Sequence, residues 1–147
     1  MKTKVVAYWA ATGILAFCIG SGGAAELAQM PGNVQGLADL GYPIYFVVLI
    51  GLWKVLGAIA VLVPGLPRLK EWAYAGIFFN MTGATVSTVA VTGTREPWHV
   101  VAQLLMAALV VVSWALRPSS RALGVLFQGR PRQASSEAFV APARLAA

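Results

Sequence analysis

One lysine stands alone in the most apolar stretch of the chain. Lys54 is the single charged residue among the 20 that separate Pro43 from Pro64. At about 1.5 Å per residue, a helix of this length spans about 30 Å, the thickness of a bilayer's hydrocarbon core, and Lys54 falls close to its midplane. An ammonium at that depth costs about 2.5–3.5 kcal/mol on insertion scales, so it needs a counter-ion, a polar cavity or a function.

Glu26 is the candidate counter-ion of Lys54. On ideal helices the two residues differ in depth by about 10–15 Å. The flexible lysine stem and a tilted or extended first helix can close that gap. Glu71 lies on the opposite side and is expected to pair with Lys70 or Arg68. We therefore expect Lys54 and Glu26 to form an ion pair that lines an outward-opening polar pocket.

Two uncharged polar residues, Asn80 and Gln103, join this set, because a four-helix bundle would turn them inward with Lys54. Their side chains can join helices, and such bonds average about 0.6 kcal/mol, so they shape packing more than they drive it. We favour that structural role over ligand binding. The candidate polar pocket or ion pair therefore consists of Lys54, Glu26, Asn80 and Gln103.

The sequence offers no catalytic constellation. Cys18 is the only cysteine and His99 the only histidine. One thiol forms neither an intrachain disulfide nor a Cys-x-x-Cys pair, and one imidazole cannot build a multi-histidine metal site. A Gly-rich phosphate loop, a nucleophile elbow and a His-Glu-x-x-His pair are also absent from the sequence. We predict no catalytic and no metal-binding residues, and we expect a protein that is not an enzyme.

The composition is that of an integral membrane protein. Hydrophobic residues make up 59% of the 147 residues and charged residues 11%. Soluble domains carry about 25% charged residues, so too few are present here to cover a water-facing surface. The apolar runs predict an all-α, up-down-up-down four-helix bundle in residues 1–118, with spans at about 5–25, 44–63, 72–91 and 98–116. A short surface helix is predicted at 33–40, with Asn33 as its N-cap.

Small residues recur at helical spacing on several spans and predict close helix packing. On the second span they are Gly51 and Ala58. These faces can pack within one bundle or between protomers, so a homo-oligomer is an open alternative. The face predicted for the first span consists of Gly13, Phe17, Gly20 and Ala24.

The basic residues indicate the orientation in the membrane. Two precede the first span, two lie between the second and third spans, and five follow the fourth, against one in the remaining connections. This asymmetry of nine to one predicts both termini in the cytoplasm and a cell membrane location, in bacteria the inner membrane. Residues 119–147 are predicted to be a disordered cytoplasmic tail. The net charge of +6 thus reflects topology and interaction with the lipid bilayer, not nucleic-acid binding.

Several segments resemble the DoxX-like family. They are Trp53-Lys54-Val55-Leu56-Gly57-Ala58, the stretch from Val63 to Gly76 with its Pro-x-x-Lys-Glu-Trp-Ala-Tyr-Ala-Gly pattern, Leu40-Gly41-Tyr42-Pro43 and Leu116-Arg117-Pro118. The resemblance covers about residues 5–118 and implies a small four-helix membrane protein. Many members carry a lysine late in the first span and a glutamate in the second. Glu26 and Lys54 look like an exchange of these two charges, which would preserve an ion pair. Members often have a Ser-His pair where this chain has Ser87-Thr88.

The resemblance implies an accessory or scaffold subunit of a membrane complex in redox or oxidative-stress metabolism, with a membrane or soluble redox protein as partner. Relatives in the wider group are associated with thiosulfate:quinone oxidoreductase as a small subunit. The alternative is a binding protein or carrier for a small lipophilic or anionic molecule, for example a quinone, in a pocket around Lys54. No cofactor is predicted beyond that candidate quinone.

Overall fold

The computed structural model describes residues 2–93, 97–118 and 121–122. The described residues form five α-helices and no strand. Four of these helices are long and apolar enough to cross a membrane, which confirms the predicted all-helical bundle with four spans. The helices are α1 (Lys2–Leu27), α2 (Pro31–Asp39), α3 (Ile44–Leu62), α4 (Pro67–Thr92) and α5 (Pro97–Ala115).

The helix starts follow the prolines more closely than the sequence patterns suggested. Pro31 opens α2, and Met30 occupies the N-cap without a side-chain bond. The prediction of Asn33 as N-cap is therefore wrong, because the fixed φ of proline suits the first helical position and the N-cap lies three residues earlier, at Met30. Pro67 likewise opens α4 directly after Leu66, whose φ of 51° is left-handed. The third span thus begins five residues before the predicted Trp72.

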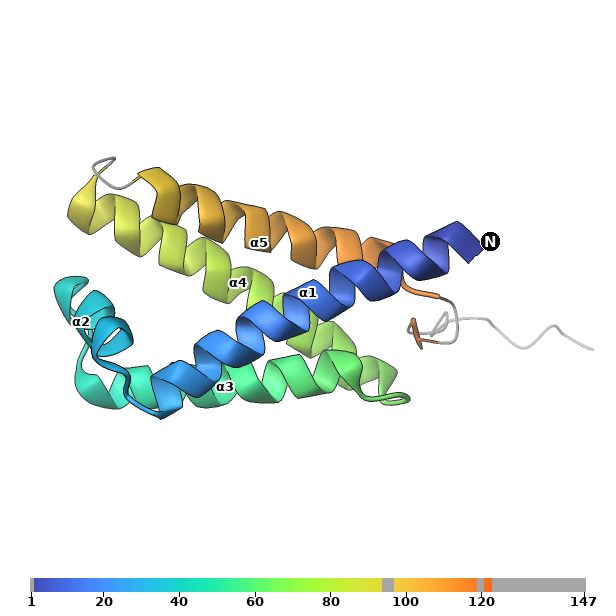
Figure 1. The fold of residues 1–147 in the computed structure, drawn as a ribbon, viewed down its shortest axis with the longest axis horizontal. Coiled ribbons are helices and arrows are strands. Elements are labelled where there is room, and N and C mark those ends of the chain that lie inside the picture. Colours follow the sequence, from blue (N-terminus) through green and yellow to red (C-terminus); the bar gives the residue numbers. More distant parts are fainter. Residues whose placement is uncertain (1, 94–96, 119–120, 123–147) are drawn as a thin grey trace, which may run out of the picture.

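The long helices pack as two pairs, α1 with α3 and α4 with α5. The pairs meet at the end of the molecule that holds the N-terminus and the last turn of α5, called here the terminal end (Figure 1). They diverge toward the opposite end, where α2 lies beside α1 and α3, and which we call the α2 end (Figure 1). The divergence makes room for a site at the α2 end.

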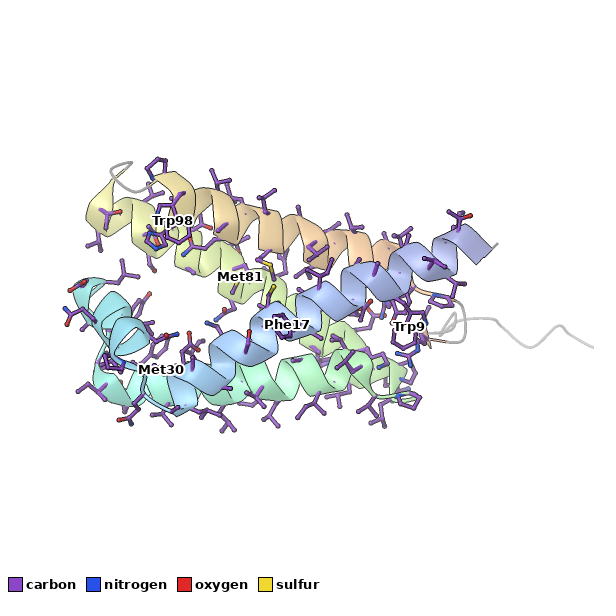
Figure 2. The ribbon with its side chains drawn as sticks, in the orientation of Figure 1. Trp9, Phe17, Met30, Met81 and Trp98 are labelled. Carbon is purple, nitrogen blue, oxygen red and sulfur yellow. The ribbon has the colours of Figure 1, made fainter. Side chains whose placement is uncertain are left out.

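The apolar core lies where the two pairs meet. Met81 of α4 belongs to this core and lies where α4 faces α1 (Figure 2). Trp9 and Trp98 lie near opposite ends of the molecule (Figure 2), in the pattern of an interfacial aromatic belt. Most other large apolar side chains face outward, as lipid contact requires. The core residues are Leu15, Ala16, Ile19, Ala58, Val61, Tyr74, Ile77, Met81, Ala107 and Val110.

Helices α1 and α3 come closest at two glycines. A Cβ built on Gly23 would lie 2.8 Å from the carbonyl oxygen of Gly51 and 2.8 Å from the Cβ of Lys54. Only glycine permits this approach. The predicted face of α1 is mostly wrong, because Gly13 and Ala24 are exposed and Phe17 is 75% exposed. Of that face, Gly20 packs inward, with its Cβ position 3.4 Å from Ala58.

The terminal end is held by buried polar contacts that the sequence analysis did not foresee. Ser113 of α5 shares hydrogen bonds with Thr12 Oγ1 of α1 at 2.7 Å and with Tyr74 Oη of α4 at 2.9 Å. This buried group of three hydroxyls ties three helices together.

Lys70 is the most unexpected residue of this end. It was counted as a cytoplasmic surface cation, yet its side chain is fully buried. Its Nζ donates to the carbonyl oxygens of Ala60 at 2.8 Å and Val61 at 3.2 Å, and also to that of Val63. A cation at a helix C-terminus satisfies carbonyls that lack a partner within the helix and opposes the negative end of its dipole. Lys70 therefore caps α3.

Glu71 faces the other way, toward α5. Its carboxylate accepts two hydrogen bonds at the end of α5. The donors are Arg117 Nη2 at 2.7 Å and Trp114 Nε1 at 2.8 Å. Glu71 was expected to pair with Lys70 or Arg68. Lys70 is not its partner, because the Lys70 ammonium is directed at α3, and these two contacts of Glu71 are made at the end of α5. Within the predicted tail, Arg121 donates to the Leu62 carbonyl at 3.2 Å. Most of that tail, residues 119–120 and 123–147, lies outside the described residues.

Candidate binding cavity

A cavity of about 720 Å³ occupies the space between the two helix pairs at the α2 end, and we call it the α2-end cavity. All five helices contribute to its wall. The four predicted residues Glu26, Lys54, Asn80 and Gln103 all line it. Ligand pockets in proteins measure about 300–1,000 Å³, so the space is large enough for a small molecule.

Lys54 and Glu26 form an ion pair in the wall of this cavity, in which Lys54 Nζ donates to Glu26 Oε1. The depth gap estimated from the sequence was too large. Glu26 lies in the last turn of α1 but level with Gly51, since a Cβ on Gly51 would come within 2.8 Å of the Glu26 Cβ. Gly51 is already well inside α3, one helical turn from Lys54. The glycine contact thus brings the carboxylate to the depth of the ammonium.

The second oxygen of the Glu26 carboxylate is left without a partner. Glu26 is 3% exposed, and its Oε2 atom is buried with no hydrogen-bond partner among the described residues. A buried polar atom without a partner costs about 1–3 kcal/mol, and more when it is charged. The ion pair is therefore only half satisfied by the protein, and the vacant oxygen belongs to a residue of the cavity wall.

Gln103 also uses only part of its hydrogen-bonding capacity. Its Nε2 donates to Thr88 Oγ1 at 3.2 Å, which joins α5 to α4 as the structural interpretation expects. Its Oε1 is buried and has no hydrogen-bond partner within the described part of the chain. Glu26 and Gln103 thus leave two buried acceptor oxygens on residues of one cavity wall.

Several wall residues were missed by sequence reasoning. Tyr42 Oη and Ser87 Oγ share a hydrogen bond of 2.6 Å that crosses from the segment before α3 to α4. Tyr42 also stacks on Phe46. Asn33 and Asp39 of α2 and His99 of α5 also line the cavity. No spacing signal marks this set, because its members come from loops and helices brought together only by the fold.

The threonines of α4 divide into two groups. Thr82 and Thr85 donate to the carbonyls of Phe78 and Met81 in their own helix. Thr88 instead accepts the hydrogen bond from Gln103 and faces the cavity.

A second cavity of about 510 Å³ lies between α3 and α4, and we call it the α3–α4 cavity. Its wall is almost entirely apolar and includes Trp53 and Trp72, which are 62% and 80% exposed on the outer surface of the bundle. Ile50, Lys54 and Asn80 line both cavities. Lys54 and Asn80 therefore stand at the boundary between a polar and an apolar compartment.

A metal centre finds no support in the described residues, where no group of three or more histidine, cysteine, aspartate or glutamate side chains could hold an ion. The chemistry available in the α2-end cavity is that of hydrogen bonding around one ion pair.

Comparison with known proteins identifies the chain by family alone. A model of the DoxX-like family matches residues 10–113, a stretch that includes all four candidate residues and both cavities. No curated protein and no solved structure matches the chain.

Proposed function

We propose that this chain, which belongs to the DoxX-like family and is a membrane protein with four spans, binds a small molecule in the α2-end cavity. The Lys54–Glu26 pair is the polar anchor of the site. One observation carries this proposal: Glu26 lines the cavity, and its buried Oε2 atom has no hydrogen-bond partner among the described residues. A ligand that donates a hydrogen bond to it would remove the cost of leaving it unpaired.

The location of the protein follows as part of the same proposal. Most basic residues precede α1, lie between α3 and α4 or follow α5 in the sequence. This asymmetry supports a cytoplasmic position for both termini and a location in the cell membrane, in bacteria the inner membrane. The α2-end cavity then opens toward the outer face.

Purification in a mild detergent followed by native mass spectrometry tests the binding function. We expect a small molecule of constant mass to accompany the wild-type protein. The Gly83→Leu variant should lose it, because a Cβ on Gly83 meets no atom within 4 Å and a leucine there extends into the α2-end cavity. Gly13→Leu is the matched control, since Gly13 is also exposed on a helix and free of neighbours, but lies outside both cavities.

Equal small-molecule content in all three proteins, or none in any, would remove the support for the cavity as a binding site. The accessory-subunit role implied by the family resemblance stays a prediction, and the same spectra test it. A protein of constant mass that accompanies the wild type and both variants would favour that role over ligand binding.

A further inference from the structure

We propose that the ligand is an amphiphile whose uncharged, hydroxyl-bearing head occupies the α2-end cavity while its hydrocarbon chain occupies the α3–α4 cavity. This inference rests on the proposed function, because it assumes that the α2-end cavity binds a small molecule. It adds the chemical class of the ligand and a second compartment for it.

The head group is defined by the atoms left vacant in the polar wall. Both buried oxygens without a partner, Glu26 Oε2 and Gln103 Oε1, are hydrogen-bond acceptors. A hydroxyl group donates to such atoms, whereas a carboxylate or sulfate cannot.

The charges of the wall also exclude an anionic head. The ammonium of Lys54 is already held by Glu26 Oε1, and Asp39 of α2 adds a second carboxylate to the lining. An anion placed beside Glu26 Oε2 would face a buried like charge at low dielectric, which is strongly unfavourable. An uncharged hydroxyl group can donate to Glu26 Oε2 without this repulsion between like charges.

The chain is placed by three residues that the walls of the two cavities share. Ile50, Lys54 and Asn80 belong to both walls, so a molecule seated against Lys54 in the polar compartment borders directly on the apolar one. Trp53 and Trp72 line the apolar compartment and are also exposed on the outer surface of the bundle, which faces lipid. A hydrocarbon chain can therefore reach it from the bilayer, between α3 and α4. At the α2 end, the Tyr42–Ser87 hydrogen bond joins the segment before α3 to α4.

Fluorescence quenching by a brominated monoacylglycerol tests both halves of the inference. The bromines, placed midway along the acyl chain, quench the fluorescence of Trp53 and Trp72 on contact. We expect saturable quenching of the wild-type protein in detergent. The Trp53→Phe/Trp72→Phe variant should lose the saturable part while retaining the other three tryptophans of the five in the chain. A fatty acid brominated at the same carbons, with its carboxylate head, should bind at least about tenfold more weakly.

Two glycines of α4 allow the two cavities to be tested separately. A Cβ on Gly76 or on Gly83 meets no atom within 4 Å, and Gly76 lines the α3–α4 cavity while Gly83 lines the α2-end cavity. Gly76→Leu and Gly83→Leu should each weaken binding of the monoacylglycerol by at least about tenfold, whereas Gly13→Leu should not change it. Ala84→Leu fills the same polar cavity and replaces Gly83→Leu if that variant does not fold.

The failures of the two proposals are distinguishable. If Gly83→Leu weakens binding and Gly76→Leu does not, the chain does not enter the α3–α4 cavity, and the inference falls while the proposed function stands. Equal or tighter binding of the carboxylate probe overturns the assignment of the head group. Quenching that never saturates, or that is equal in every variant, overturns the inference as mere detergent partitioning. A wild-type dimer that Gly76→Leu converts to a monomer would show that a second copy of the chain fills the α3–α4 cavity instead.

Discussion

Gly23 and Gly51 meet with each Cβ position 2.8 Å from the backbone carbonyl oxygen of the other residue. This mutual contact sets the distance between α1 and α3. It also places Glu26, three residues after Gly23, beside the helix that carries Lys54, three residues after Gly51. The ion pair is therefore a consequence of a backbone contact, and not of side-chain reach alone.

The first prediction concerns this contact. Gly51→Ala adds a methyl group that clashes with backbone atoms, which cannot move as a flexible side chain would. We expect a loss of about 1–3 kcal/mol of stability, the usual cost of overpacking. Thermal unfolding in detergent measures it. Gly22→Ala is the control, because a Cβ there meets no atom within 4 Å and its melting temperature should stay equal or rise.

The second prediction concerns the ion pair. Lys54→Met leaves the buried Glu26 carboxylate without its cation, and breaking a buried pair costs about 3–5 kcal/mol. The melting temperature should fall and ligand retention should be lost. The exchange variant Glu26→Lys/Lys54→Glu should recover part of the stability that either single change removes. Unchanged stability and unchanged ligand content in Lys54→Met would contradict an ion pair of any importance.

The third prediction concerns Lys70. Replacing Lys70 with methionine removes the donor to the last carbonyls of α3. We expect the variant to lose at least about 1–3 kcal/mol of stability, the cost of leaving a buried carbonyl without a hydrogen bond. Arg68→Met is the matched control, because Arg68 is an exposed cation two residues away. We expect thermal unfolding to separate the two variants by several degrees. Equal melting temperatures would mean that Lys70 acts only as a surface charge.

The fourth prediction concerns orientation. With Cys18 changed to serine, a cysteine at the exposed position Ala38 of α2 should react with a membrane-impermeant maleimide added to intact cells. A cysteine at Arg68 should react only after the membrane is made permeable. The opposite pattern would reverse the proposed topology and place the α2-end cavity on the cytoplasmic side.

Much of the architecture could be read from apolar periodicity, since four long apolar runs between proline-rich turns correspond to α1, α3, α4 and α5. Which side of each helix is buried could not be read from the sequence. The face predicted for α1, with Gly13 and Phe17, is one residue and about 100° away from the buried face of Thr12 and Ala16. Small residues occupy both faces, so their spacing does not discriminate between them.

Lys70 illustrates a different limit. Its basic neighbour Arg68 and the adjoining prolines and glycine are typical of a surface turn. Because α4 begins at Pro67, however, Lys70 falls on the same helical face as Tyr74, Ile77 and Met81, all of which are buried. That periodicity is visible in the sequence once the helix start is known. The hydrogen bonds to α3 are not, because they depend on how tightly the turn folds back.

The placement of both charges of the ion pair within α1 and α3 has a mechanical consequence. At the α2 end the Tyr42–Ser87 hydrogen bond joins the two helix pairs through neutral groups, whereas Thr12 and Tyr74 meet at Ser113 at the terminal end. A movement of the α4–α5 pair away from α3 would therefore break the neutral Tyr42–Ser87 contact and leave Lys54 beside Glu26. Such a movement would change the width of the α2-end cavity without exposing an unpaired charge of this ion pair.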